Sequence, residues 1–351
     1  MSGRRTQDST QGVGWPAPSM LLGMLLVLGP SVGADAAELY IGQGLVPVRN
    51  FQPLQGLSLQ MPVDSAMPLR SGELSLRAHV AETSTILRET TGTGTSAILK
   101  FGQLRSAFDI RYGTAMEDVE VGLEFASLYR HSSGIDGLVL AGESLTGQSA
   151  PIRQQLKKQG YAYSVGGGNT SLNPPNDAFG LTDIVAHVKA LMVAEGMYIP
   201  ATSLRVALKV PVGDRSRAFG TGVADLGVGL SLQKTVWNRV GLYVNLNEVL
   251  PTGHYSGLAL RGYFTMVTGV EFMATPKFSI TGQFDYYQSP FGNTGLKLLD
   301  RGVTEAVLAF GYRFTPTLLW QIYGVENLDF IRDSAADFTI GTALTYRIPS
   351  K

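Results

Sequence analysis

A regular alternation of residue types runs through the last stretch of this chain, residues 338–348, and limits the folds open to it. One set of positions is Phe338, Ile340, Thr342, Leu344, Tyr346 and Ile348, and the set between them is Thr339, Gly341, Ala343, Thr345 and Arg347. The first set is mainly apolar and aromatic, and the second is small or polar. A barrel that spans a bilayer needs this pattern, because lipid surrounds it while water or polar side chains fill it.

The same alternation recurs along most of the chain from about residue 72 onward. The early candidate strands are 74–80, 96–112, 118–125, 183–192 and 203–210, and the later ones are 223–232, 239–249, 259–273, 278–287, 302–313, 317–325 and 337–348. Most of them reach about 10 residues, the length that crosses a bilayer at a tilt. The pattern therefore predicts an all-β fold, a transmembrane antiparallel up-and-down β-barrel of about 12 strands over residues 72–351.

The connections between the candidate strands provide an independent test of this prediction. The odd-numbered connections are 87–95, 130–180, 213–222, 250–258, 288–301 and 326–336, and the even-numbered ones are 113–116, 195–201, 233–238, 274–277 and 314–316. Each odd connection is longer than its even neighbours, as expected for long extracellular loops alternating with short periplasmic turns. An even strand count also places both ends of the barrel on the periplasmic side.

The N-terminal region has the features of a secretory signal peptide, which we place at residues 1–36. Arg4 and Arg5 supply positive charge, residues 20–28 form a short apolar run, and Ala34-Asp35-Ala36 is a small-x-small cleavage site. The apolar run is shorter than the roughly 20 residues that a spanning helix needs. Export together with a barrel pattern predicts localisation in the bacterial outer membrane.

Two segments do not follow the alternation. Residues 37–71 contain Pro47, Pro53, Pro62 and Pro68, too many for a strand interior, and predict an irregular leader. The leader either stays in the periplasm or enters the lumen; a tether without function is the alternative.

The second exception is residues 130–180, which form a loop far longer than a hairpin needs. A short helix is expected from Ser149 and Pro151 to Gly160. This outer loop either is structured, capping the mouth or folding inward, or is a flexible surface loop.

Composition excludes several classes of function. Lysine and arginine total 28 and aspartate and glutamate 28, so no basic excess points to nucleic acid. Cysteine is absent, which excludes disulfides and thiolate chemistry, and the four histidines lack metal-ligand spacing. No cofactor is implied. The expected partners are outer-membrane lipid, the barrel assembly machinery during insertion, and a small solute.

Several short motifs are similar to those of a known family. Residues 47–54 (PVRNFQPL) resemble the opening of a Gram-negative outer-membrane family catalogued as a domain of unknown function. Residues 129–136 (YRHSSGID), 180–183 (GLTD) and 208–214 (LKVPVGD) are similar to further marks of that family. The resemblance covers nearly the whole mature chain and implies an outer-membrane barrel, without an activity or a site.

The last strand also resembles the signal that barrel assembly machinery recognises, in Thr339, Gly341, Leu344 and Tyr346. Such barrels commonly end on an aromatic residue, whereas this chain continues through Ile348 to Lys351.

Charged residues at inward positions are the candidate functional residues. The predicted lumen-lining set is Arg77, Asp109, Arg111, Asp118, Glu120, Glu124, His187, Lys189, Arg205, Lys209, Glu271, Asp285, Glu305 and Arg313. Such charges set selectivity if the lumen is open, and the carboxylates on the second and third strands would then favour cations. Alternatively, the charges pair with one another and plug the interior.

Two His-x-Ser triplets, His131 to Ser133 and His254 to Ser256, raise the possibility of lipid hydrolysis. Outer-membrane phospholipases and lipid A deacylases are barrels that use such a pair, and the resemblance extends to three residues only. Both triplets lie in or beside predicted loops, next to glycines, so we expect no enzyme. The prediction is a narrow passive channel or small-solute transporter with a charged lumen. The alternatives are a closed barrel that presents the 130–180 loop to a partner, and the lipid hydrolase.

Overall fold

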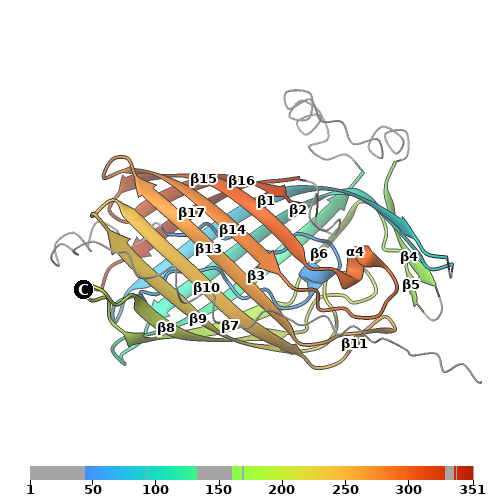
Figure 1. Ribbon diagram of the computed structural model, residues 1–351, viewed down its shortest axis with the longest axis horizontal. Helices are drawn as coiled ribbons and strands as arrows, with labels where there is room; N and C mark the ends of the chain where they lie inside the picture. The colour runs from blue at the N-terminus through green and yellow to red at the C-terminus, as the bar shows by residue number, and fades with distance from the viewer. Residues whose placement is uncertain are drawn as a thin grey trace, which may run out of the picture.

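The computed structural model describes residues 44–92, 94–132, 160–167, 170–328, 336 and 338–350. Its main strands are β1 (Leu74–Thr90), β2 (Ser96–Gly113), β3 (Val119–His131), β7 (Ile184–Val193), β8 (Ala201–Val210), β9 (Asp225–Val236), β10 (Val240–Pro251), β13 (Tyr263–Met273), β14 (Phe278–Tyr287), β15 (Val303–Thr315), β16 (Leu318–Asn327) and β17 (Phe338–Ile348). These strands lie side by side and strongly tilted around one cylinder (Figure 1).

The sheet is a closed barrel, because its first and last strands pair. β1 runs antiparallel to β17 from Leu74 opposite Ile348 to Ser84 opposite Phe338. Each main strand also pairs antiparallel with the main strand that follows it along the chain. This pairing confirms the predicted barrel of 12 strands. Closure leaves no main strand with an unpaired edge exposed to lipid, as a membrane barrel requires.

The two ends of the barrel differ. The end where β17 stops, here called the terminal end, carries the short connections 114–118, 194–200, 237–239, 274–277 and 316–317. The opposite end, here called the loop end, carries 132–183, 211–224, 252–262, 288–302 and 328–337. Several predicted connections are wrong in extent. Residues 87–90 continue β1, which pairs with β2 as far as Thr90 opposite Ser96, so only 91–95 form the turn. Residues 233–236 continue β9, and the strand predicted from residue 259 begins at Tyr263.

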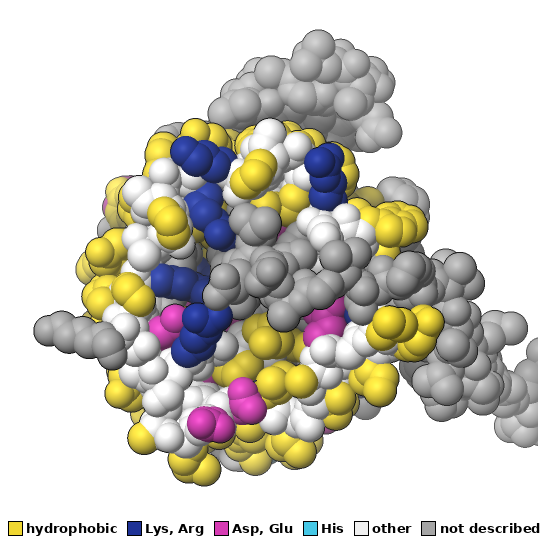
Figure 2. All heavy atoms as spheres, turned by 90° about the vertical axis from the view of Figure 1, so that its left-hand side faces the viewer, with side chains coloured by type: hydrophobic (Ala, Val, Ile, Leu, Met, Phe, Trp, Pro, Cys, Tyr) yellow, Lys and Arg dark blue, Asp and Glu magenta, His cyan; other side chains and the backbone are white. Residues whose placement is uncertain are grey.

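The outer face of the barrel is apolar. Phe108, Leu123 and Leu308 are about half exposed at outward positions of their strands. Viewed along the axis, hydrophobic side chains surround the cylinder (Figure 2). Near the terminal end, Phe314 contacts Tyr312 and Trp320, with ring centroids 5.0 and 6.5 Å away. An apolar belt with aromatic residues at its margin is typical of a lipid-facing surface.

The proline-rich leader lies inside the barrel as a hairpin over residues 44–73. At the terminal end, the amide of Gly44 donates to Glu271 Oε2 over 3.0 Å. The chain then crosses the lumen to a 3-10 turn, η3 (Gln55–Leu57), near the loop end (Figure 1). It returns so that the amide of Leu69 donates to Glu120 Oε2 over 2.8 Å, again at the terminal end. The prolines suit this path, since the leader takes no part in a ladder.

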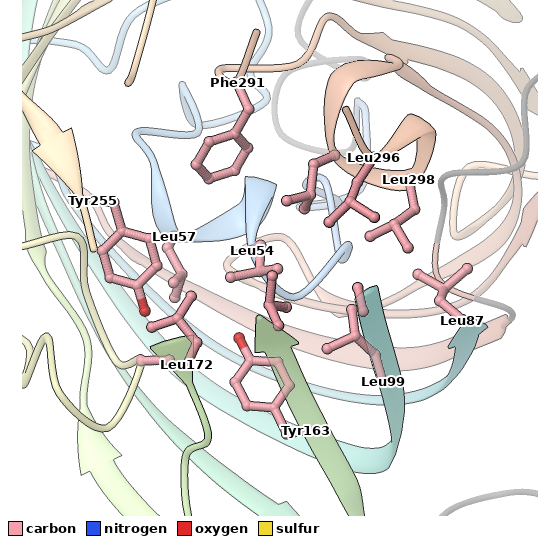
Figure 3. Packing of buried hydrophobic residues seen from close by; sticks show 14 of the residues in the cluster. Leu54, Leu57, Leu87, Leu99, Tyr163, Leu172, Tyr255, Phe291, Leu296 and Leu298 are labelled. Carbon is pink, nitrogen blue, oxygen red and sulfur yellow. The ribbon is translucent and has the colours of Figure 1, made fainter. Parts of the chain in front are cut away.

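The loop end is covered by short elements that pack on the turn of the leader. They are β4 (Ala162–Gly167), β5 (Thr170–Leu172), β11 (His254–Tyr255), β12 (Leu258–Ala259) and α4 (Lys297–Asp300). A further short strand, β6 (Ala178–Leu181), pairs with the end of β3 in the wall. Leu54 and Leu57 of the leader are buried among Tyr163, Phe291 and Leu298 (Figure 3). We call this cluster of buried residues the apolar cap.

Some predictions fall outside the described residues, namely the signal peptide 1–36 and the helix expected from Ser149 to Gly160. Within the described ranges, no helix is both long and apolar enough to cross a bilayer.

Candidate functional site

An ion-pair network near the terminal end of the lumen surrounds Arg111, a buried side chain on β2. Its Nε atom lies 2.6 Å from Asp109 Oδ2, and its Nη1 atom lies 2.5 Å from Asp64 Oδ2 of the leader. Glu120 Oε1 is 3.7 Å from the same Nη1 atom. A buried guanidinium is stable only when carboxylates and hydrogen bonds compensate for its lost hydration. The leader therefore supplies part of what Arg111 needs.

Lys189 on β7 joins the same network from the next strand but one. Its Nζ atom is 2.8 Å from Asp64 Oδ2 and 3.3 Å from Glu120 Oε1. Glu120 and Lys189 are directly opposite in the β3–β7 register, so their proximity follows from strand pairing. The Nζ atom also donates to the carbonyl of Met67 over 3.0 Å, which fixes the returning arm of the leader.

Arg105 is an important lumen residue that the sequence prediction missed. Its Nη2 atom lies 2.5 Å from Glu124 Oε1, and its side chain is almost fully buried. It could have been found, because it lies an even number of residues from Asp109 and Arg111 on β2 and so faces the same side of the sheet. His187, which was predicted, lies 3.2 Å from Asp109 Oδ1 through its Nε2 atom.

A second network near the loop end centres on Lys209 of β8. Its Nζ atom is 3.0 Å from Asp183 Oδ2 and 3.1 Å from Asp225 Oδ2. Asp225 in turn accepts a hydrogen bond of 2.7 Å from the amide of Leu59 in the leader. Asp183, Asp225 and the leader were not part of the predicted set, since they lie at strand ends or outside the alternation.

The opposite wall of the lumen, on β13, β14 and β15, is acidic. Glu271 Oε2 accepts hydrogen bonds from the Tyr243 hydroxyl over 2.9 Å and from the leader. Asp285 accepts one from the Tyr287 hydroxyl over 3.3 Å and is opposite Glu305 in the β14–β15 register. All three carboxylates are buried. Arg313, at the terminal end of β15, is half-buried.

Two predicted arginines bind neutral groups. Arg77 Nε donates to Thr345 Oγ1 over 3.1 Å. Arg205 donates to the carbonyl of Pro62 and to Asn247 Oδ1, both over 2.5 Å. Neither makes an ion pair within the ranges that the structure describes.

The predicted position of Asp118 in the lumen is wrong. This residue is exposed in the turn 114–118 and has a φ of 63°, whereas β3 begins at Val119. The turn needs a residue that tolerates positive φ, and aspartate does so better than a β-branched residue. Alternation in the sequence continued through Asp118 and gave no sign that the strand had ended.

The expected cation preference also loses its basis. Asp109, Glu120 and Glu124, the carboxylates of β2 and β3 that face inward, each contact an arginine or lysine side chain. Paired carboxylates exert little field on a passing ion compared with free ones.

Three small cavities follow one another between the leader and the part of the wall around β2 and β3. The space open to the centre of a water molecule is about 40, 30 and 20 Å³ from the loop end to the terminal end. The first two share Arg49 and Arg105, and the last two share Arg77 and Arg111. Each has room for one or a few waters. With the leader in place, each of these three cavities is too small for a solute much larger than water.

Comparison with known families decides where this chain belongs. The profile of the family described as "Protein of unknown function (DUF3187)" matches residues 22–348. The chain belongs to the DUF3187 family. Among curated proteins, no sequence matches it.

Solved structures similar to this DUF3187 protein are outer-membrane barrels. The COG4313 outer membrane channel from Pseudomonas putida F1 has a TM-score of 0.57 at 11% identity, covering 82% of this chain and 100% of the channel. This likeness shows the fold. The porin NanC is 10% identical with a TM-score of 0.45, covering 78% and 100% of the two chains. The P. putida toluene transporter TodX is 9% identical with a TM-score of 0.38, covering 80% and 90%.

The His-x-Ser triplets of the DUF3187 protein do not form a recognisable catalytic pair in the described residues. His254 is exposed on β11, and Ser256 has a φ of 47° in the turn that follows. Tyr255 between them belongs to the apolar cap, where burial raises the pKa of its hydroxyl to about 12. His131 lies 3.1 Å from Glu82 Oε1, and Ser133 is outside the described residues.

Proposed function

We propose that this protein is a narrow outer-membrane channel for small solutes that its own leader holds closed. In this proposal the terminal end faces the periplasm and the loop end faces the exterior. Outer-membrane lipid surrounds the apolar belt, and barrel assembly machinery inserts the chain.

The observation that carries the proposal is the polar contact between leader and wall. Many of the leader's contacts are single hydrogen bonds from its backbone amides to side chains of the wall, including Val46 to Gln283 Oε1 over 2.6 Å and Asp64 to Asn245 Oδ1 over 2.9 Å. Water can replace each such bond at little net cost, since an intramolecular hydrogen bond contributes only about 0.5–1.5 kcal/mol. The leader is not part of the sheet, so the ring of paired strands stays intact when the leader leaves. A polar lumen filled in this way suits a removable plug.

A second candidate, the sealed barrel that presents its outer loops, is favoured by the apolar cap. Leu54 and Leu99 are fully buried there, and Leu298 and Leu299 of α4 pack on the same cluster. Apolar contacts cannot be exchanged for water without loss, so the cap resists opening at the loop end. The two candidates therefore differ in whether the leader moves under native conditions.

Single-channel conductance with a cross-linkable leader separates them. The Ser203 hydroxyl donates to the carbonyl of Ala66, so cysteines at these two positions would join β8 to the returning arm of the leader. The native chain contains no cysteine, so no competing disulfide can form. We expect the reduced Ala66→Cys/Ser203→Cys protein to give discrete conductance steps in a planar bilayer, and the oxidised protein to be silent.

The single variants Ala66→Cys and Ser203→Cys, treated with the same oxidant, control for the effect of the thiols alone. Equal conductance in the oxidised and reduced states would show that the leader is not the gate. Silence in both states, from protein that shows the heat-modifiable migration of a folded barrel, would reject the channel and favour the sealed barrel.

A further inference from the structure

We infer that the basic cluster of Arg77, Arg111, Lys189 and Arg347 at the terminal end binds the carboxylate or phosphate group of an anionic solute. We also infer that Asp64 of the leader occupies this site in the closed state as an internal substitute for that group. The inference rests on the proposed channel function and names its solute class.

Strand register brings the arginines together. Ser75 on β1 is opposite Arg347 of β17 on one side and opposite Arg111 of β2 on the other. Arg77 lies two residues further along β1 on the same, inward face. Three guanidinium groups on three adjacent strands therefore converge on the cavity nearest the terminal end, which all of them line.

Without the leader, the cations around this cavity outnumber the carboxylates. Its lining contains the four cations and two carboxylates, Asp64 and Glu120. Asp109 is bonded to Arg111 from the neighbouring cavity, and Glu73 at the rim attracts Arg347. Four cations thus face four carboxylates when the leader is docked. Withdrawal of Asp64 leaves one positive charge in excess, which an incoming anion would neutralise.

The contacts of Asp64 define what that anion must offer. One oxygen, Oδ2, lies 2.5 Å from Arg111 and 2.8 Å from Lys189. This geometry is a charge-assisted interaction of one oxyanion oxygen with two cations, which an oxygen of a carboxylate or a phosphate can make. A solute carrying either group can make the same contacts after Asp64 leaves.

Donor capacity remains for more than one oxygen. Within the described residues, Arg111 Nη2 and Arg347 Nε are buried and have no hydrogen-bond partner. Arg111 as a whole is only 6% exposed, so this orphan donor is costly to leave unsatisfied. Arg77 and Arg347 form no ion pair with any described carboxylate within 4.0 Å. The cluster therefore offers donors to a multivalent oxyanion that Asp64 alone does not use.

The cluster also continues along the lumen. The cavity that shares Arg77 and Arg111 with it is lined further on by Arg105 and Arg49. Arginines at successive levels would allow an anion to pass from one to the next, because weak binding at several sites permits both entry and exit. Exchange of the anion for Asp64 would also loosen the returning arm of the leader, so that binding and opening are coupled.

Binding can be measured without conduction by thermal unfolding of the full chain in detergent. The probes are inorganic phosphate and succinate, with potassium chloride at matched ionic strength as the reference. We expect both probes to raise the Tm saturably, since a ligand of the folded state stabilises it. Arg77→Gln/Arg347→Gln should abolish this rise. Arg130→Gln, at a buried arginine near the loop end of β3 that does not line this cavity, should keep it.

Asp64→Asn provides the opposite change. Removal of the competing carboxylate should lower the half-saturating phosphate concentration on the order of tenfold. An equal phosphate-induced rise in Tm in the wild type and in Arg77→Gln/Arg347→Gln would overturn the inference, as would the lack of any rise. A rise with succinate alone would assign the site to carboxylates, and a rise with phosphate alone to phosphates.

The outcomes separate this inference from the proposed function. Saturable phosphate binding by a protein that never conducts would reject the channel and retain the site. Conductance without a phosphate effect on Tm would retain the channel and reject the site.

Discussion

Asp64 Oδ2 of the leader lies 2.5 Å from Arg111 Nη1 of β2, inside the lumen near its terminal end. This contact joins a segment outside the sheet to the wall of the barrel. It also completes the charge balance of the wall, because Arg111 and Lys189 share the same oxygen. The leader is therefore an electrostatic component of the closed barrel as well as a space-filling one.

Loss of that carboxylate should weaken the closed state. In Asp64→Asn, Arg111 keeps Asp109 and Glu120, so we expect a cost of about 1–3 kcal/mol, below that of a fully orphaned charge. The Tm of the protein should fall, and the open probability in planar bilayers should rise several-fold. An unchanged Tm together with unchanged gating would show that the contact does not hold the leader.

The Arg105–Glu124 pair should show strong energetic coupling. Both side chains face the lumen, with side-chain exposures of 5% and 20%. A double-mutant cycle with Arg105→Leu and Glu124→Gln should give a coupling energy of about 1–3 kcal/mol by chemical unfolding. Strict additivity of the two single variants would mean that water already screens the pair.

The apolar cap should depend on the turn of the leader. Leu54 is fully buried, so Leu54→Ala should cost about 2–5 kcal/mol through lost contacts and a residual cavity. We expect faster cleavage of the leader in limited proteolysis as well. Leu308→Ala, at an outward position that is 54% exposed, is the control and should leave both measurements near wild type in detergent.

Two buried tyrosines should respond in opposite ways to loss of the hydroxyl. The Tyr263 hydroxyl donates to the carbonyl of Leu59 in the leader, so Tyr263→Phe should destabilise by about 1 kcal/mol or more. The Tyr255 hydroxyl has no partner among the described residues, so Tyr255→Phe should be neutral or stabilising. Chemical unfolding of the two variants in parallel checks the prediction, and an equal loss in both would contradict it.

A pair of glycines tests the packing of the wall. A Cβ atom at Gly122 would lie 2.3 Å from His187 Cε1, whereas one at Gly282 meets nothing within 4 Å. Gly122→Ala should therefore displace His187 from Asp109 and lower the Tm by several degrees, at about 1–3 kcal/mol of overpacking cost. Gly282→Ala, on another main strand, should fold with a Tm near wild type. The reverse order of the two Tm values would reject the packing of His187 described here.

Local pattern in the sequence was enough to find the barrel strands, but less reliable at their ends. The alternation of β17 predicted which of its side chains lie outward, and Leu344 and Tyr346 are indeed exposed while Ala343 and Thr345 are buried. At Asp118 the same pattern continued into a turn, where the backbone conformation rather than the polarity of the residue ends the strand. At residues 87–90, β1 continues although the alternation of apolar and polar residues has ended. Leu87 lies past the apolar outer face of the barrel and is buried in the apolar cap.

Alternation along each strand predicted which charged residues face the lumen. It did not predict which residues they would pair with. Arg111 and Asp109 could be placed inward from β2 alone, yet Asp64 lies in a segment without any period. The same holds for Asp225, which the lumen network uses at the very start of its strand.

The sequence by itself determined the class of fold, because a period of two along each strand and the length of each strand are local properties. Each strand has apolar residues on one face and polar residues on the other. In a closed membrane barrel the apolar faces meet lipid, the polar faces meet the lumen, and all backbone groups are paired. The tertiary structure alone decided that the leader fills the lumen. That result depends on contacts such as Leu59 with Asp225 and Asp64 with Arg111, between residues far apart in the chain. Their energies arise only after the barrel has closed and removed both partners from water.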